Sequence, residues 1–133
     1  MDSKLNRITY VEDEPDIRAI TQIALEQVGG YTLDVCSSGA EAVEKTSQFQ
    51  PDLILMDVMM PEMDGIQTLQ ALRQDPKLSD TPVAFMTARV QGHEVNQYKE
   101  AGSAGVIAKP FDPMTLAEEV RAIWQDATDR SDK

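Results

Sequence analysis

The chain has 133 residues, 41% of them hydrophobic, and a formal net charge of −11. This length fits one ordinary domain, and the hydrophobic fraction excludes an intrinsically disordered chain. The excess of acidic residues argues against nucleic acid and anionic membranes as partners, because both are bound by clusters of Lys and Arg.

Strand-like and helix-like segments alternate along the chain. In chain order, we expect a strand at 5–11, a helix from 14 to 28, a strand at 31–36, a helix opened at 38–41, a strand at 52–57, a helix from 64, a strand at 81–87, a helix at 91–101, a strand at 104–110 and a last helix capped by Asp112 with Pro113 in its first turn. The first helix should bury Ile17, Ile20, Ala24, Leu25 and Val28, whereas the helix at 91–101 has few apolar residues and should dock weakly. We expect the domain at 4–128 and a frayed polar tail at 129–133.

This alternation predicts the fold class. Five strands that alternate with five helices imply an α/β fold, in which a parallel sheet is covered by helices on both faces. In such a doubly wound sheet the working site lies at the carboxyl ends of the strands. Functional residues are therefore expected directly after the strands.

Polar side chains follow four of the five predicted strands. The segment "LILMD" ends a buried run on Asp57, although an ionised carboxylate is costly to bury without a partner. The first strand is followed by Glu12 and Asp13, the fourth ends on Thr87, and the fifth delivers Lys109. We expect these groups to meet in one crevice.

The residue types in that crevice predict a Mg²⁺ site that accepts a phosphoryl group. Three carboxylates repel one another unless a cation joins them, and oxygen ligands select a hard divalent ion such as Mg²⁺. The three negative charges of Glu12, Asp13 and Asp57 would be balanced by Mg²⁺ together with Lys109. Asp57 is then the candidate nucleophile, while Mg²⁺, Lys109 and Thr87 neutralise the phosphoryl oxygens.

Four motifs together resemble the receiver domain of two-component response regulators. They are "VEDEPDIR", "LILMDVMMPEMDG", "MTAR" and "AGSAGVIAKPF", which occur in the order and at the spacing of that family and span essentially the whole chain. The resemblance implies a flavodoxin-like fold with strand order 2-1-3-4-5. It also implies a signalling switch that catalyses only its own phosphorylation and slow dephosphorylation. The partners would be a histidine kinase or histidine phosphotransfer protein as phosphoryl donor, and a downstream protein target of unknown identity.

The resemblance assigns the phosphoacceptor and the metal ligands. Asp57 would take the phosphoryl group from phosphohistidine. Asp13, Asp57 and the backbone carbonyl of Met59 would bind Mg²⁺ directly. Glu12 would act through the water shell of the metal.

Other residues would carry the signal from the phosphoryl group. Lys109 would pair with that group, and the Lys109–Pro110 peptide bond would be cis. Thr87 would move toward the new phosphoryl oxygens and pull its loop along. Val106 stands where many members carry Tyr or Phe, and a valine is stiff at χ1. We therefore expect the coupling of Thr87 to differ from that of these members.

A receiver-like adaptor that binds partners without phosphorylation is the alternative function. Its mark would be the loss of Asp57, Asp13 or Lys109, and all three are present. A flavin-phosphate site is disfavoured because "EDEP" would repel the phosphate. A haloacid-dehalogenase-type phosphatase needs a second acid where Met59 stands.

The remaining reactive residues are expected to be structural. His93 lies in a polar segment without an acidic or metal-binding companion, so we expect a surface residue. Cys36 is the only cysteine, which excludes an internal disulfide, and should be a small buried hydrophobe. The first residues lack the apolar segment of a signal peptide, and no stretch is long enough to span a membrane. We therefore expect a reduced, cytoplasmic location.

Overall fold

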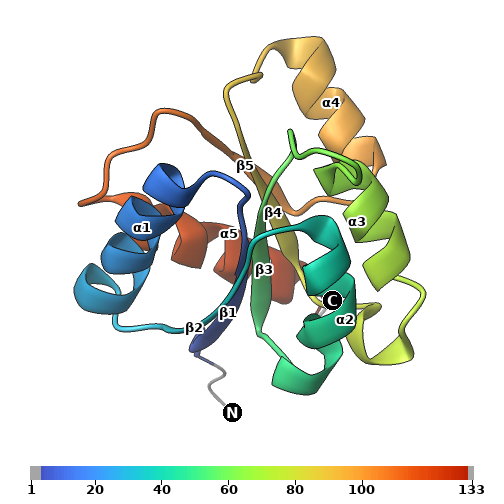
Figure 1. Ribbon diagram of the computed structural model, residues 1–133, viewed down its shortest axis with the longest axis horizontal. Coiled ribbons are helices and arrows are strands. Elements are labelled where there is room, and N and C mark those ends of the chain that lie inside the picture. Colours follow the sequence, from blue (N-terminus) through green and yellow to red (C-terminus); the bar gives the residue numbers. More distant parts are fainter. Residues whose placement is uncertain (1–3, 132–133) are drawn as a thin grey trace.

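A five-stranded parallel β-sheet forms the centre of the computed structural model, which describes residues 4–131 (Figure 1). The strand order is β2-β1-β3-β4-β5, as the resemblance implied, and all neighbouring strands are parallel. The strands are β1 (Arg7–Val11), β2 (Thr32–Cys36), β3 (Leu53–Asp57), β4 (Val83–Thr87) and β5 (Gly105–Ala108). Each lies within the segment predicted for it. The central strands β3 and β4 are buried at every residue, which explains their nearly continuous apolar sequence.

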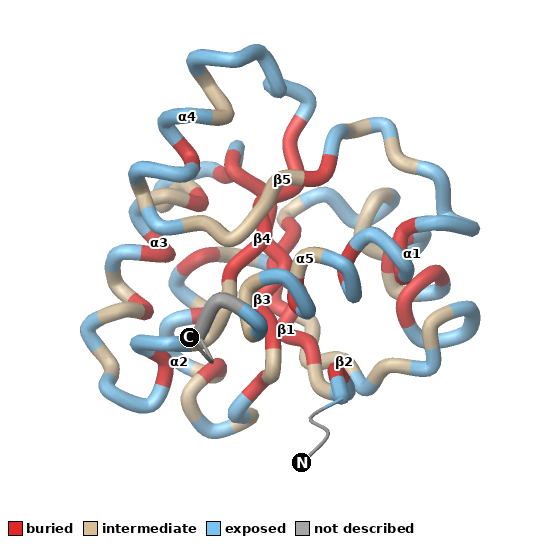
Figure 2. The backbone as a smooth tube through the Cα atoms, turned by 180° about the vertical axis from the view of Figure 1, so that it is seen from behind, coloured by how far each residue is buried: buried red, intermediate tan, exposed pale blue. Residues whose placement is uncertain are grey.

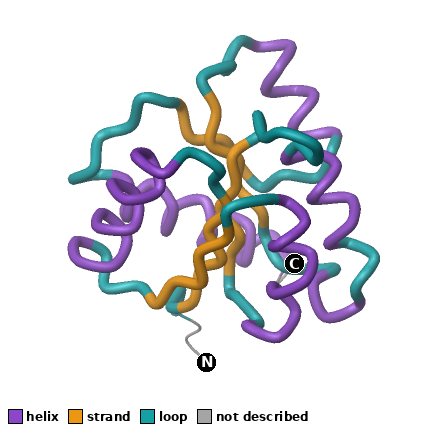
Figure 3. The backbone as a smooth tube through the Cα atoms, in the orientation of Figure 1, coloured by secondary structure: helices purple, strands orange, loops and turns teal. Residues whose placement is uncertain are grey.

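Helices connect the strands and cover both faces of the sheet (Figure 3). They are α1 (Pro15–Ile23), the π-helical turn η1 (Ala24–Val28), α2 (Gly39–Phe49), α3 (Gly65–Leu72), the short 3₁₀ helix η2 (Pro76–Leu78), α4 (Gly92–Glu100) and α5 (Leu116–Ser131). Helices α1 and α5 lie on one face of the sheet, and α2, α3 and α4 lie on the other (Figure 1). None of the helices in the described part of the chain has the length and apolarity that a membrane crossing requires.

Two hydrophobic layers fill the spaces between the sheet and the helices. Side chains alternate between the faces of a strand, so Tyr10 belongs to the layer under α1 and α5, whereas Val11 belongs to the layer under α2, α3 and α4. Leu25 and Trp124 pack in the first layer, and Leu69 packs in the second. The buried residues are concentrated along the strands, which makes the sheet a rigid platform for its loops (Figure 2).

The first helix differs from the sequence prediction in what it buries. Ala24 and Leu25 are buried as expected, but Ile20 and Val28 are 49% and 47% exposed. The chain forms a π turn over Ala24–Val28, closed by a hydrogen bond from the Gly29 N–H to the Ala24 carbonyl at 3.1 Å. A π turn contains more residues than an α turn, so it rotates Val28 away from the direction that α-helical spacing predicts.

The last helix differs from the prediction at both ends. It begins at Leu116 rather than at Pro113, because residues 113–115 form a turn. Asp112 caps this turn instead, and its Oδ1 accepts a hydrogen bond from the Met114 N–H at 2.9 Å. The helix then continues to Ser131, through residues expected to be a frayed tail. Residues 132 and 133 of that tail lie outside the described part of the chain.

Candidate functional site

The carboxyl ends of β1, β3, β4 and β5 meet at one edge of the sheet, toward the top of Figure 1. The strands β1 and β3 are in register, so that the residues before Glu12 and Asp57 lie side by side. The register of β4 and β5 places Thr87 beside Ala108, the residue before Lys109. The strand-end residues singled out in the sequence thus lie along one edge of the sheet.

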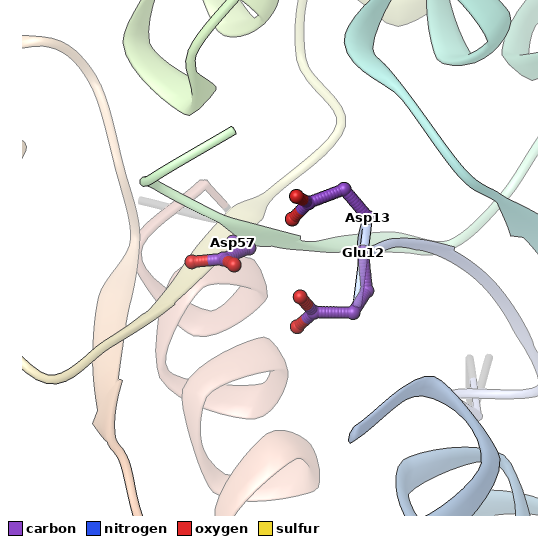
Figure 4. A group of neighbouring side chains, drawn as sticks. All are labelled: Glu12, Asp13 and Asp57. Carbon is purple, nitrogen blue, oxygen red and sulfur yellow. The ribbon is translucent and has the colours of Figure 1, made fainter. Parts of the chain in front are cut away.

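Three carboxylates form a cluster at the ends of β1 and β3. One carboxylate oxygen from each of Glu12, Asp13 and Asp57 lies within 4.8 Å of the others. The three side chains point into one shared space (Figure 4). Glu12 is fully buried, Asp57 is 5% exposed and Asp13 is half-buried, so the cluster opens to solvent on the Asp13 side. Three oxygen ligands from carboxylates fit a hard divalent cation such as Mg²⁺.

Lys109 supplies the positive charge that this cluster needs within the protein. Its Nζ lies 3.0 Å from Glu12 Oε1 and 3.1 Å from Asp57 Oδ2, and the side chain is only 15% exposed. One amine therefore faces two buried carboxylates and can balance the charge of only one of them. The Lys109–Pro110 peptide bond is cis, as the resemblance implied.

Burial and crowding change the proton affinity of two of these groups. Desolvation raises the pKa of Glu12 to about 7, and the neighbouring Asp57 adds to this effect, while Lys109 opposes it. For Lys109, burial acts to lower the pKa, but its hydrogen bonds to Glu12 and Asp57 outweigh burial and raise it above its ordinary value. Without a metal, one lysine amine faces three carboxylates, so the site carries an excess of negative charge.

The loop after β3 holds the Asp57 carboxylate in place. The Met59 N–H donates to Asp57 Oδ1 at 3.2 Å, and the Gly65 N–H donates to the Val58 carbonyl at 2.8 Å. A Cβ atom at Gly65 would lie 2.6 Å from the Asp57 carbonyl oxygen, so only glycine fits this close approach. Asp64 then caps α3 in a capping box with Gln67. The Met59 side chain is 56% exposed at the rim of the site.

Comparison with known proteins agrees with this geometry. Residues 8–121 match the family model of the response regulator receiver domain. The chain belongs to the response regulator receiver family. Response regulator Rre1 of Synechocystis sp. is 38% identical to this receiver domain over 115 residues, which cover 86% of this chain and 49% of Rre1. The transcriptional regulatory protein ResD of Bacillus subtilis is 35% identical over 127 residues, which cover 94% of this chain and 50% of ResD.

Solved receiver structures share the whole fold. The chemotaxis response regulator CheY4 of Vibrio cholerae superimposes with a TM-score of 0.83 at 28% identity, over 90% of this chain and 99% of CheY4. The receiver domain of a signal transduction histidine kinase from Syntrophus aciditrophicus gives a TM-score of 0.78 at 34% identity, over 91% of each chain. The present chain spans about half the length of Rre1 and ResD but nearly the full length of CheY4.

Thr87 is tied to the cluster through its main chain, because its carbonyl accepts a hydrogen bond from the Lys109 N–H at 2.9 Å, whereas its side chain bonds to the loop after β4. It is 1% exposed, and its Oγ1 accepts a hydrogen bond from the Arg89 N–H at 3.0 Å. Arg89 is also tied to α4, because the Tyr98 hydroxyl donates to the Arg89 carbonyl at 3.0 Å. Tyr98 packs edge-on against Phe85 of β4, with ring centroids 5.6 Å apart. The loop after β4 is therefore linked to α4 through main-chain contacts of Arg89.

Two residues that support the site were not identified from the sequence. The Arg18 guanidinium donates to the Glu12 carbonyl at 2.9 Å, and the Tyr10 hydroxyl donates to Glu12 Oε1 at 3.4 Å. Tyr10 precedes Glu12 by two residues, which places both side chains on the same face of an extended chain. That spacing was a usable signal for Tyr10. The two residues expected to be structural have the expected burial, since His93 is exposed and Cys36 is fully buried.

Proposed function

We propose that this receiver domain accepts a phosphoryl group on Asp57 from a phosphohistidine donor and acts as a signalling switch. The observation that carries the proposal is the Lys109 amine shared by Glu12 and Asp57, beside a third carboxylate. A site that is short of positive charge until a metal enters suits the transfer of an anionic phosphoryl group.

The residues of the site would divide the work of phosphoryl transfer. One Asp57 oxygen attacks phosphorus, the bond from phosphorus to the donor imidazole breaks, and its electron pair stays on that nitrogen. The Met59 N–H and Lys109 already hold the two oxygens of Asp57, at 3.2 and 3.1 Å, so the carboxylate is oriented before the donor arrives. Lys109 then pairs with the transferred group. Thr87, at the end of β4, would donate its hydroxyl to a phosphoryl oxygen.

Mg²⁺ would be held by Asp13, Asp57 and the Met59 carbonyl, with Glu12 facing its water shell. The bound ion would neutralise charge on the carboxylates and on the transferring phosphoryl group. The donor set supports this, because all three clustered side chains offer carboxylate oxygens.

The donor protein would approach over the side of the site formed by α1 and the loop after β5. An apolar groove there is lined by Ile17, Ile20, Lys109, Pro110, Phe111 and Pro113. Lys109 belongs to both the groove and the cluster, so a donor protein resting in the groove would lie beside Asp57. Ile20 of α1 is 49% exposed and Met114 of the loop after β5 is 68% exposed, so both apolar side chains are available to a partner beside the groove.

Acetyl phosphate, a small phosphoryl donor, tests the proposal without a partner protein. Wild type and Asp57→Asn are incubated with acetyl phosphate and Mg²⁺, and their intact masses are compared. We expect wild type to gain one phosphoryl group and Asp57→Asn to gain none. Equal masses for the two proteins would instead favour an adaptor that binds partners without phosphorylation.

One observation favours that adaptor as the second candidate. A groove between α4 and β5 is lined by Val90, Val95, Lys99, Gly105, Val106 and Ala108. Val106 stands in this groove where many receivers carry an aromatic side chain, so the groove is open to a partner in the unphosphorylated protein.

A further inference from the structure

The Tyr10 side chain lies directly beneath the acidic cluster and touches it with its hydroxyl. Tyr10 is fully buried in the layer under α1 and α5. Its hydroxyl lies 3.4 Å from Glu12 Oε1, which is longer than a usual O–H···O hydrogen bond and leaves room for the contact to shorten when Lys109 moves away. Burial raises the pKa of Tyr10 above its ordinary value, so the phenol keeps its proton and acts as a neutral donor.

Glu12 depends on a small number of donors because its carboxylate has no access to solvent. Lys109 Nζ binds Oε1 at 3.0 Å, the same oxygen that Tyr10 contacts, and the Glu14 N–H donates to Oε2 at 3.3 Å. Lys109 also binds Asp57 at 3.1 Å, so Glu12 shares its strongest donor with the phosphorylation site. A buried carboxylate that loses a charged donor needs another hydrogen bond to stay in place.

Phosphorylation would take that shared donor away. In the function proposed above, Lys109 pairs with the phosphoryl group on Asp57 and releases Glu12. Among the described residues, the side-chain donor that then remains within reach of Glu12 Oε1 is the Tyr10 hydroxyl.

We propose that Tyr10 is a positioning residue for the Mg²⁺ site, which holds the Glu12 carboxylate toward the metal whether or not Lys109 is bound to it. The inference rests on the proposed function, because it concerns how the same site keeps its shape during phosphoryl transfer. Tyr10 touches neither the metal nor phosphorus and acts through Glu12.

Direct Mg²⁺ binding tests this role in the unphosphorylated protein. We expect Tyr10→Phe, which removes only the hydroxyl, to weaken Mg²⁺ binding in isothermal titration about tenfold, the lower end of effects seen for groups that orient metal ligands. Thr9→Val is the matched control, because Thr9 is the neighbouring residue of β1 and its hydroxyl is also fully buried, with no hydrogen-bond partner within the described residues. Thr9→Val should bind Mg²⁺ like wild type.

A double-mutant cycle separates positioning from packing. If Tyr10 acts through Glu12, Tyr10→Phe should have no further effect on Mg²⁺ affinity in a Glu12→Gln background. In phosphorylation by acetyl phosphate, Tyr10→Phe should raise the Mg²⁺ concentration for half-maximal rate about tenfold and leave the rate at saturating Mg²⁺ unchanged.

The outcomes distinguish this inference from the proposed function. If wild type is phosphorylated and Tyr10→Phe binds Mg²⁺ as wild type does, the positioning role is wrong and the proposed function stands. Equal effects of Tyr10→Phe with and without Glu12 would also overturn it, as would an affinity that falls only together with the circular dichroism signal. A wild-type protein that takes up neither Mg²⁺ nor phosphoryl groups would overturn the proposed function and this inference with it.

Discussion

Replacing Glu12 by Gln tests whether its buried carboxylate destabilises the metal-free protein at neutral and alkaline pH. The folded state raises the pKa of Glu12 to about 7 from an ordinary value of 4.5. The folded protein therefore binds the Glu12 proton more tightly than the unfolded chain does. The contribution of Glu12 to the free energy of unfolding is therefore highest below pH 4.5. It falls as the pH rises from 4.5 to about 7, and it stays low once Glu12 is ionised in the folded protein.

The size of this effect follows from the two pKa values. Each pH unit between them corresponds to about 1.4 kcal/mol, so an ionised Glu12 lowers the free energy of unfolding by about 3 kcal/mol at pH 8. Gln resembles the protonated side chain in shape and hydrogen bonding. We therefore expect Glu12→Gln to be about 3 kcal/mol more stable than wild type at pH 8, and at most about 1 kcal/mol more stable at pH 5.

Urea unfolding in the presence of EDTA measures this difference. Trp124 is the only tryptophan and is 9% exposed, so its fluorescence reports the loss of the layer under α1 and α5. Glu14→Gln is the matched control, since it removes one negative charge from an exposed position of the same loop. Mg²⁺ should reduce the stability difference between Glu12→Gln and wild type at pH 8, because it stabilises the ionised carboxylates of wild type. Equal stability of Glu12→Gln and Glu14→Gln at pH 8, or a gain that is the same at both pH values, would refute the reasoning.

Three further predictions follow from contacts around the site. Gly65→Ala should lower the free energy of unfolding by about 2 kcal/mol or more in the same urea assay, because its Cβ would lie 2.6 Å from the Asp57 carbonyl oxygen. Gly92→Ala is the control and should be neutral or slightly stabilising, because no atom lies within 4 Å of its Cβ. Ile20→Asp should slow phosphotransfer from a histidine donor protein but not from acetyl phosphate, and equal loss with both donors would contradict a docking role. Val43→Asp is the control: Val43 is also exposed but lies on α2, so its replacement should slow neither reaction. Hydrogen exchange over α4 (Gly92–Glu100) should change when beryllofluoride mimics the phosphoryl group, because α4 has a single buried residue in the described chain and is therefore weakly held. Unchanged protection there would contradict a coupling between Asp57 and α4.

Local patterns in the sequence were sufficient for the secondary structure of the sheet. All five strands lie within their predicted segments, because apolar runs bounded by Gly, Pro and polar residues are a property of neighbouring residues. The same reasoning did not detect the π turn at Ala24–Val28. Whether Val28 faces the core depends on how the helix packs against α5, and helical spacing alone assumes an ideal α-helix.

The candidate site was also recognisable from strand ends. Glu12, Asp13, Asp57 and Lys109 were expected in one crevice, and the structure brings their charged groups together. The ligand role expected for the Met59 carbonyl remains a prediction, as does the movement of Thr87. Tyr10 lies in the strand predicted at 5–11, but the sequence does not indicate a role for its hydroxyl, because that role depends on the Glu12 carboxylate that it reaches.

The sequence by itself determined which residues are apolar, which end a strand and how many carboxylates follow, since these depend on the order of residues alone. Tertiary structure decided which of them touch. Glu12 and Lys109 are far apart in the chain, and only the strand order β1-β3-β4-β5 and the burial around them bring the Lys109 amine to 3.0 Å from Glu12. The raised pKa of Glu12, its contact with the Tyr10 hydroxyl and the exposed face of α1 have the same origin. They depend on the removal of solvent and on atomic distances, which exist only after the layers have packed.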